Sequence, residues 1–261
     1  MRIALGLEYD GASYCGWQHQ PAGCGVQDHV ERALSAFAAS AVETVAAGRT
    51  DAGVHARAQV LHFDTGAARE ESAWVRGPNA MLASTIRILW ARQVPGEFHA
   101  RHRARSRTYQ YLLQDDAVAP GLMHTKVGWF HRPLDVVLMH EAAQALVGEH
   151  DFSSFRDAQC QARTPVRIVS EAGVARHGNL VVLTIRANAF LHHMVRNIVG
   201  SLVYVGAGRQ PPDWIARLRD SRDRRLAAPT FAPHGLYLAA IDYDPQYGLP
   251  AFRPCPFLPS P

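Results

Sequence analysis

Lysine is nearly absent from this chain. Lys126 is the single lysine among 27 basic residues, so the formal net charge of +4 is carried almost entirely by arginine. Guanidinium groups bind phosphates through paired hydrogen bonds and stack on bases. The charge is therefore compatible with a nucleic-acid partner, although an arginine-rich genome would give the same bias.

Cysteine is also scarce, and long apolar runs are missing. No C-x-x-C pair occurs among the four cysteines, which argues against a disulfide framework and a zinc ribbon; they are Cys15, Cys24, Cys160 and Cys255. No window reaches the length of a membrane span, and residues 1–5 run into a strand-like pattern, not a signal peptide. We expect a cytoplasmic protein in a reducing compartment, with no membrane partner.

What is present is an ordinary globular composition, with 48% hydrophobic and 19% charged residues in 261. The hydrophobic periodicity predicts a similar order of elements in two halves. In the first half, strands and helices are expected at 3–9, 26–37, 42–47, 59–63, 70–82 and 85–94. In the second half they are expected at 108–113, 134–147, 166–175, 180–187, 191–203 and 236–243.

Each half therefore reads β-α-β-β-α-β, which is the ferredoxin-like unit. We predict an α/β (α+β) protein of two such halves, each with a mainly antiparallel sheet and helices on one face, meeting at a central cleft. The expected domains are an N-terminal α/β half at 1–105 and a C-terminal α/β half at 106–245. The Pro-rich tail at 246–261 is expected to be irregular.

A short polar turn follows the apolar run 42–47 and places Arg49 and Asp51 between Gly48 and Gly53. Residues two positions apart do not form a helical salt bridge, and the glycines let the backbone bend and approach a ligand. A carboxylate there can be a nucleophile, a general base or a metal ligand. A neighbouring guanidinium favours its ionised form. Taken alone, the pattern also fits a solvated hairpin turn.

Arginines stand at every second position from residue 101 to residue 107. In an extended chain all four lie on one face, which suits a phosphate backbone, and Phe98 is placed to stack on a base. A solvated edge strand protected by charge is the other explanation.

Two tyrosines, Tyr109 and Tyr111, alternate on a predicted strand and so share one face. Aromatic residues on strands commonly belong to the core or the sheet surface. A tyrosine can also stack under a base and take part in proton transfer. The residues alone favour a structural role for both.

The run 47–56 as a whole resembles the catalytic loop of the tRNA pseudouridine synthase A family, whose motif reads G-R-T-D-x-G-V-H. Further segments that resemble family motifs follow in order along almost the whole chain; they are 9–18, 98–101, 152–155, 160–165, 190–197 and 229–238. The resemblance implies the pseudouridine synthase fold and an isomerase that converts uridine to pseudouridine. The implied targets are positions 38, 39 and 40 of the tRNA anticodon stem-loop.

The resemblance also implies roles for individual residues. Asp51 would be the nucleophile, and Arg196 would pair with it. Tyr109 would pack against the uracil and help to remove the C5 proton, and Arg49 would fill the space left by the flipped uridine. Further RNA contacts are expected from Arg69, Phe98, His99, Arg101, Gln161 and Arg163. The partner is tRNA, a homodimer is implied, and neither a metal nor an organic cofactor is.

Three other interpretations compete with this one. A tandem ferredoxin-like RNA-binding protein without catalysis would stack bases on its sheets, but it has no need of the Asp51 turn. The sequence of residues 64–66 resembles an aspartic protease motif, yet a second copy is missing, and we expect Asp64 to lie in a turn that ends a strand. His192 and His193 would need further ligands to bind zinc. As neighbours on a predicted helix their side chains should point about 100° apart, and a structural or RNA-facing role is expected.

Overall fold

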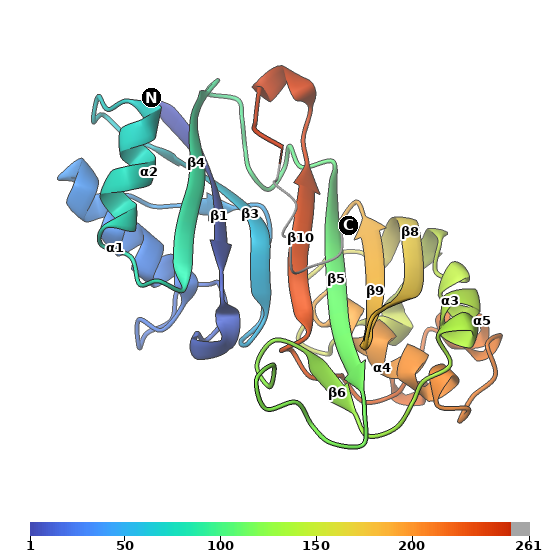
Figure 1. Cartoon of the computed structure of the whole chain (residues 1–261). Coiled ribbons are helices and arrows are strands. Elements are labelled where there is room, and N and C mark those ends of the chain that lie inside the picture. Colours follow the sequence, from blue (N-terminus) through green and yellow to red (C-terminus); the bar gives the residue numbers. More distant parts are fainter. Residues whose placement is uncertain (252–261) are drawn as a thin grey trace. The chain divides into compact units, whose positions relative to one another are not determined.

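The computed structural model describes residues 1–251, which pack as two compact units (Figure 1). The first unit contains residues 1–105 together with residues 237–251, and the second contains residues 106–236. The α/β class with mainly antiparallel strand pairing is confirmed.

The first unit follows the order β-α-β-β-α-β. Its elements are β1 (Arg2–Tyr9), η1 (Gly11–Ser13), α1 (Val26–Ala38), β2 (Val45–Ala46), β3 (His55–Asp64), α2 (Glu71–Asn79) and β4 (Ile86–Val94). Strand β1 pairs antiparallel with β3 on one side and with β4 on the other. The opposite edge of β3 pairs with β2 near its end and, in parallel, with β10 (Leu236–Asp242) near its start. The short η4 (Pro245–Tyr247) follows β10.

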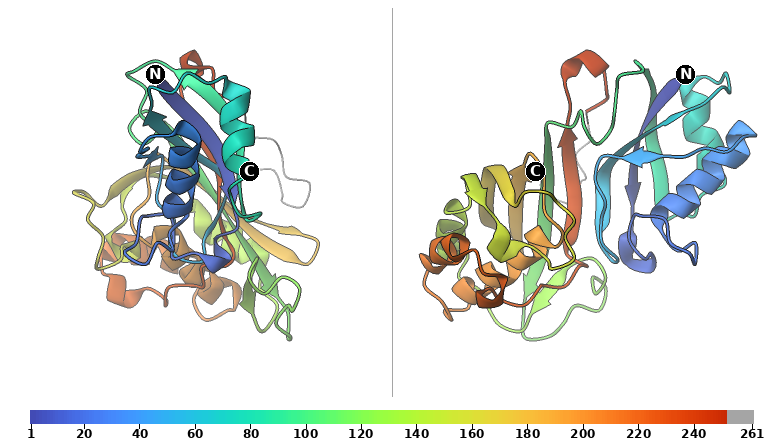
Figure 2. Two further views of the ribbon diagram at one scale, coloured as in Figure 1. Left: turned by 90° about the vertical axis from the view of Figure 1, so that its left-hand side faces the viewer. Right: turned by 180° about the vertical axis from the view of Figure 1, so that it is seen from behind.

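Aromatic packing joins the two helices of this unit to its sheet. Trp74 on α2 is fully buried. Its ring meets Phe37 of α1 and Phe63 of β3 edge-on, both at a centroid distance of 5.1 Å. Figures 1 and 2 show α1 and α2 on the same side of the sheet, so both α-helices in the described part of this unit cover one face.

The second unit is built on a sheet with the strand order β5-β9-β8-β7, and β6 pairs in parallel with β5. Its elements are β5 (Ser106–Asp115), β6 (Gly128–Phe130), α3 (Val136–Gln144), β7 (Gly148–Asp151), η2 (Ser153–Phe155), β8 (Val166–His177), β9 (Leu180–Ala187), α4 (Met194–Gly206), α5 (Trp214–Ser221) and η3 (Arg224–Leu226). The expected β8–β9 hairpin is confirmed, and Gly178 supplies its positive φ of 60°. In α4 the predicted apolar stripe is buried.

Several expectations need correction. The strand expected at 42–47 is reduced to β2, because Thr44 donates both its N–H and its hydroxyl to Glu31 Oε1 on α1, at 2.7 and 2.8 Å. The helix expected at 134–147 is shorter. Asp135 caps its start by accepting from two backbone N–H groups, and Gly148, with φ of +115°, already begins β7.

Cysteine usage also differs from the prediction. Cys15 and Cys24 form a disulfide, with a Cα–Cα distance of 5.4 Å, whereas Cys160 is a free thiol. The two partners are nine residues apart in the sequence, so no short motif marked them. Cys255 and most of the Pro-rich tail, residues 252–261, lie outside the described residues. Within residues 1–251, no helix combines the length and the apolar character needed to cross a bilayer.

Candidate active site

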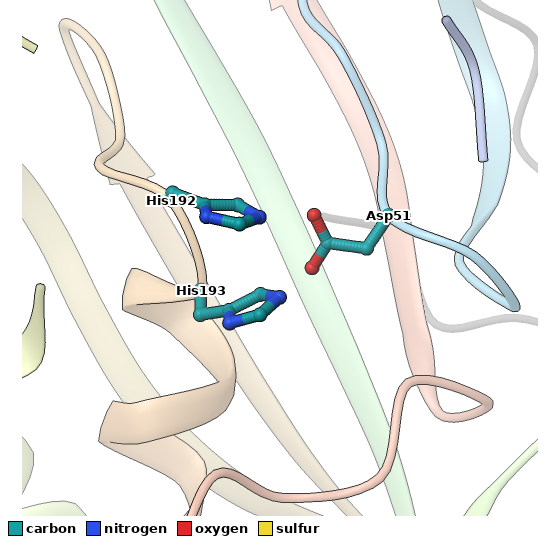
Figure 3. A group of neighbouring side chains, drawn as sticks. All are labelled: Asp51, His192 and His193. Carbon is teal, nitrogen blue, oxygen red and sulfur yellow. The ribbon is translucent and has the colours of Figure 1, made fainter. Parts of the chain in front are cut away.

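The turn that carries Asp51 connects β2 to β3 (Figure 3). The backbone N–H of Val54 donates to the Asp51 carbonyl oxygen at 3.1 Å, and Gly53 adopts a φ of +77°. This closes a tight turn that only glycine enters without strain. The Asp51 side chain is partly exposed and Arg49 is exposed. The expected glycine turn is therefore present, and the residue that carries its carboxylate is partly exposed.

Strand β3 holds the first half of this turn. Ala47 N–H donates to the Val60 carbonyl oxygen at 2.8 Å, and the Gln59 side-chain amide donates to the Gly48 carbonyl oxygen at 2.7 Å. Gln59 is fully buried. A buried amide bonded to a loop carbonyl fixes the loop, because breaking the bond would leave a polar group unsatisfied. The residues before Asp51 are thus rigidly connected to the sheet.

Tyr109 and Tyr111 lie on β5 in the second unit and differ in their surroundings. The Tyr111 hydroxyl donates to the Ala232 carbonyl oxygen at 2.7 Å, and burial raises the pKa of this phenol far above its ordinary value. Tyr111 is therefore a core residue. The Tyr109 ring meets Phe190 edge-on at 5.0 Å, an aromatic neighbour that constrains the orientation of the ring.

Arg196 lies on the first turn of α4. Its Nε donates to the Phe231 carbonyl oxygen at 2.8 Å, which orients the guanidinium. His193 immediately precedes the helix with an unusual φ of +59°, and its Nδ1 lies 2.8 Å from Asp157 Oδ2. Burial raises the pKa of Asp157, but hydrogen bonds from the Gln159 N–H and from His193 bring that pKa below its ordinary value. The contact between His193 and Asp157 stabilises the strained backbone at the start of α4.

The two histidines do not separate as expected. His192 and His193 both precede α4 and lie outside the helix (Figure 3). Their rings lie 3.9 Å apart at an interplanar angle of 31°. The angle of about 100° applies only to neighbours inside a helix, so that prediction was wrong.

The segment expected to present a row of arginines is not extended. Residues 100–103 form a turn, in which Arg103 N–H donates to the His99 carbonyl oxygen at 2.9 Å, and β5 begins only at Ser106. Arg107 is buried and donates to the Asn188 carbonyl oxygen at 2.8 Å. The four guanidinium groups therefore do not share one strand face.

Phe98 also departs from expectation. Its side chain is fully buried and packs against Tyr243 and Tyr247, at centroid distances of 5.4 and 5.0 Å. The ring is part of the core of the first unit, so it does not offer a face to a base. The stacking role expected for Phe98 is incompatible with this position.

The other expected RNA contacts lie at or near the surface. Arg101, Gln161 and Arg163 are exposed, and the Arg69 guanidinium lies over the Phe37 ring at 5.3 Å. His99 is half-buried; burial and the neighbouring His102 lower its pKa. These side chains remain candidates for binding RNA.

Asp64 has a structural partner. Both carboxylate oxygens accept from Arg2, at 2.9 and 2.6 Å, and this hydrogen bonding lowers the pKa of Asp64. The pair lies at the end of β3 and the start of β1, so it joins two strands. The interpretation of Asp64 as a residue that ends a strand accounts for the protease-like motif.

The sequence did not reveal the contacts between residues 9–17 and the Asp51 turn. The Tyr9 hydroxyl lies 2.7 Å from Thr50 Oγ1 in the interior of the first unit. The sequence marks Tyr9 only through the family segment 9–18, because nothing in its sequence neighbourhood indicates a partner 41 residues away.

Comparison with known proteins shows a match over most of the chain. A family model described as tRNA pseudouridine synthase matches residues 7–103 and 142–244. The tRNA pseudouridine synthase A of Bordetella avium is 57% identical over 251 residues, covering 95% of this chain and 94% of that protein. The proteins of the same name from Methylobacillus flagellatus and Thiobacillus denitrificans are each 54% identical, covering 96% of both chains.

Proposed function

Because this chain belongs to the tRNA pseudouridine synthase family, we propose that it isomerises uridine at positions 38, 39 and 40 of the tRNA anticodon stem-loop, with Asp51 as the nucleophile. The observation that carries the proposal is the Asp51 turn. It presents a partly exposed carboxylate on a backbone that buried hydrogen bonds fix to β3. A rigid nucleophile reaches its target atom with little loss of entropy in the transition state.

The proposed reaction is balanced without a redox partner. The bond between C1′ of the ribose and N1 of uracil breaks while Asp51 holds one fragment covalently. The base then rotates, C5 bonds to C1′, C5 loses its proton, and N1 gains one. Tyr109 packs against the uracil and assists removal of the C5 proton. No electrons are gained or lost, so the proposal includes neither a metal nor an organic cofactor.

Arginine side chains have separate roles in this proposal. Arg49 occupies the space that the flipped uridine leaves, and Arg196 keeps Asp51 ionised. Side chains at or near the surface fix the register of the tRNA through its backbone; they are Arg69, Arg101, Gln161 and Arg163, which are exposed, and the half-buried His99. We also propose that the enzyme works in the cytoplasm as a homodimer, in which one protomer holds the body of the tRNA that its partner modifies. Light scattering should then give twice the chain mass of 28.7 kDa.

The test uses tRNA transcripts that carry tritium at C5 of uracil. Formation of the new bond expels the C5 hydrogen, so tritium should appear in water when uridine occupies position 38, 39 or 40. The matched control transcript carries cytidine at these three positions and should release none. Equal release from both transcripts would refute the proposed target positions. Tight binding with no release from either would favour the non-catalytic RNA-binding protein.

A further inference from the structure

We propose that Tyr9 is a positioning residue for catalysis, which holds Asp51 in place through a hydrogen bond to Thr50. This inference rests on the proposed role of Asp51. The Tyr9 hydroxyl and Thr50 Oγ1 lie 2.7 Å apart, and both residues are buried, at 4% and 6% exposure. Thr50 is the residue directly before Asp51, so fixing Thr50 restricts the backbone that leads to the nucleophile.

Burial makes this hydrogen bond costly to break. A hydroxyl that loses its partner inside the protein keeps the full desolvation penalty, and water cannot replace the bond. Burial also raises the pKa of Tyr9 well above its ordinary value, so the phenol stays protonated throughout the working range of pH. Tyr9 itself lies at the end of β1, next to a register shift between β1 and β3.

The chain just beyond Tyr9 holds the backbone of the same turn. Trp17 N–H donates to the Thr50 carbonyl oxygen at 2.9 Å, and the Trp17 ring packs against Tyr9 with centroids 5.8 Å apart. Thr50 is therefore held twice, by its side chain through Tyr9 and by its carbonyl group through Trp17.

The segment that supplies these contacts is itself fixed. Gln27 N–H at the start of α1 donates to the Trp17 carbonyl oxygen at 2.9 Å, and Val26 N–H donates to the Gly16 carbonyl oxygen at 3.0 Å. When Cys15 and Cys24 are oxidised, their disulfide closes residues 15–24 into a loop that contains Trp17, but the two backbone bonds do not depend on it. The Asp51 turn is thus supported from β1 and α1 as well as from β3.

The test is a set of variants assayed by single-turnover tritium release and by tRNA binding. Tyr9→Phe and Thr50→Val each remove one hydroxyl of the pair and should lower the rate at least about tenfold, because a small displacement of a catalytic group slows its reaction strongly. The Kd for tRNA should stay within about twofold, because neither hydroxyl is exposed to RNA. Thr50→Ser keeps the hydroxyl and should restore most of the rate.

Two controls make the result specific. Tyr14→Phe removes a hydroxyl of the same segment, but its partner is Thr85 Oγ1 at 2.6 Å, so the rate should not change. The double variant Tyr9→Phe/Thr50→Val should be no slower than Tyr9→Phe alone, because Tyr9→Phe already breaks the bond to Thr50.

Several results would overturn the positioning role. They are a Tyr9→Phe rate equal to that of Tyr14→Phe, a loss of tRNA affinity that matches the loss of rate, and multiplicative effects in the double variant. Asp51→Ala separates this proposal from the one on which it rests. If Asp51→Ala keeps the wild-type rate, both proposals fail. If Asp51→Ala is inactive while Tyr9→Phe is fully active, only the positioning role fails.

Discussion

Replacing Gly16 by alanine should displace the turn that carries Asp51. Gly16 has a φ of +94°, and a Cβ atom there would lie 2.8 Å from the Thr50 carbonyl oxygen and 3.2 Å from the Asp51 carbonyl carbon. Atoms in ordinary contact lie roughly 3.4 Å apart or more. The Thr50 carbonyl group would therefore have to move by about 0.6 Å.

The glycine at position 23 offers a matched control. Its φ is +67°, but a Cβ atom there would meet nothing within 4 Å. Alanine in a left-handed backbone conformation costs about 1–2 kcal/mol, and Gly23→Ala should lose only this much unfolding free energy. Gly16→Ala should lose at least as much unfolding free energy. It should also lose catalytic rate, because the new Cβ atom displaces the turn that carries Asp51.

The assay compares both variants by urea unfolding and by single-turnover tritium release, below their melting temperatures. We expect the rate of Gly16→Ala to fall by about tenfold to a hundredfold, since displacements below 1 Å already weaken catalysis. Gly23→Ala should keep the wild-type rate. Equal rates for the two variants would refute the argument that this close contact supports the Asp51 turn.

Three further predictions concern stability. Cys15→Ser, or reduction of the Cys15–Cys24 disulfide, should lower the unfolding free energy by about 3 kcal/mol, because the disulfide closes a short loop. Urea unfolding with and without reductant measures this difference, and equal stability in both states would contradict the prediction. His62 accepts a hydrogen bond from Ala100 N–H at 3.2 Å, and burial lowers its pKa from 6.5 to about 4. The folded protein therefore favours neutral His62. Its contribution to the free energy of unfolding is complete above pH 6.5 and is lost as the pH falls towards 4. In urea unfolding at several pH values, His62→Gln should lose less stability over this pH range than wild type does. Phe98→Ala should cost about 3–5 kcal/mol, and thermal unfolding should show a large drop, whereas an unchanged midpoint would contradict the burial of Phe98.

Local patterns predicted most of the framework. The apolar periodicity of α1 and α4 corresponds to their buried residues. The apolar runs in β1 and β9 correspond to strands that are largely buried. The short elements β6, β7 and α5 were not predicted, because a few residues of strand or helix carry too little periodicity. The arginine alternation at 101–107 misled because the turn at 100–103 is fixed by backbone bonding that charge does not encode.

In the candidate site, too, local features could be predicted from the sequence and long-range contacts could not. Asp51 could be singled out because its turn chemistry is local and matches a family motif. The contacts that support the Asp51 turn could not be predicted, because the Tyr9–Thr50 hydrogen bond and the Cys15–Cys24 disulfide depend on how the chain folds. The burial of Phe98 was missed for a related reason, since its neighbours Tyr243 and Tyr247 come from the end of the chain.

The role of Asp51 as the nucleophile is tested most directly by comparing wild type with Asp51→Ala on one tritium-labelled tRNA transcript, with no metal or cofactor added. We predict that wild type releases tritium into water and that Asp51→Ala binds the same tRNA with similar affinity but releases none. Tritium release by Asp51→Ala at the wild-type rate would contradict the assignment of Asp51 as the nucleophile.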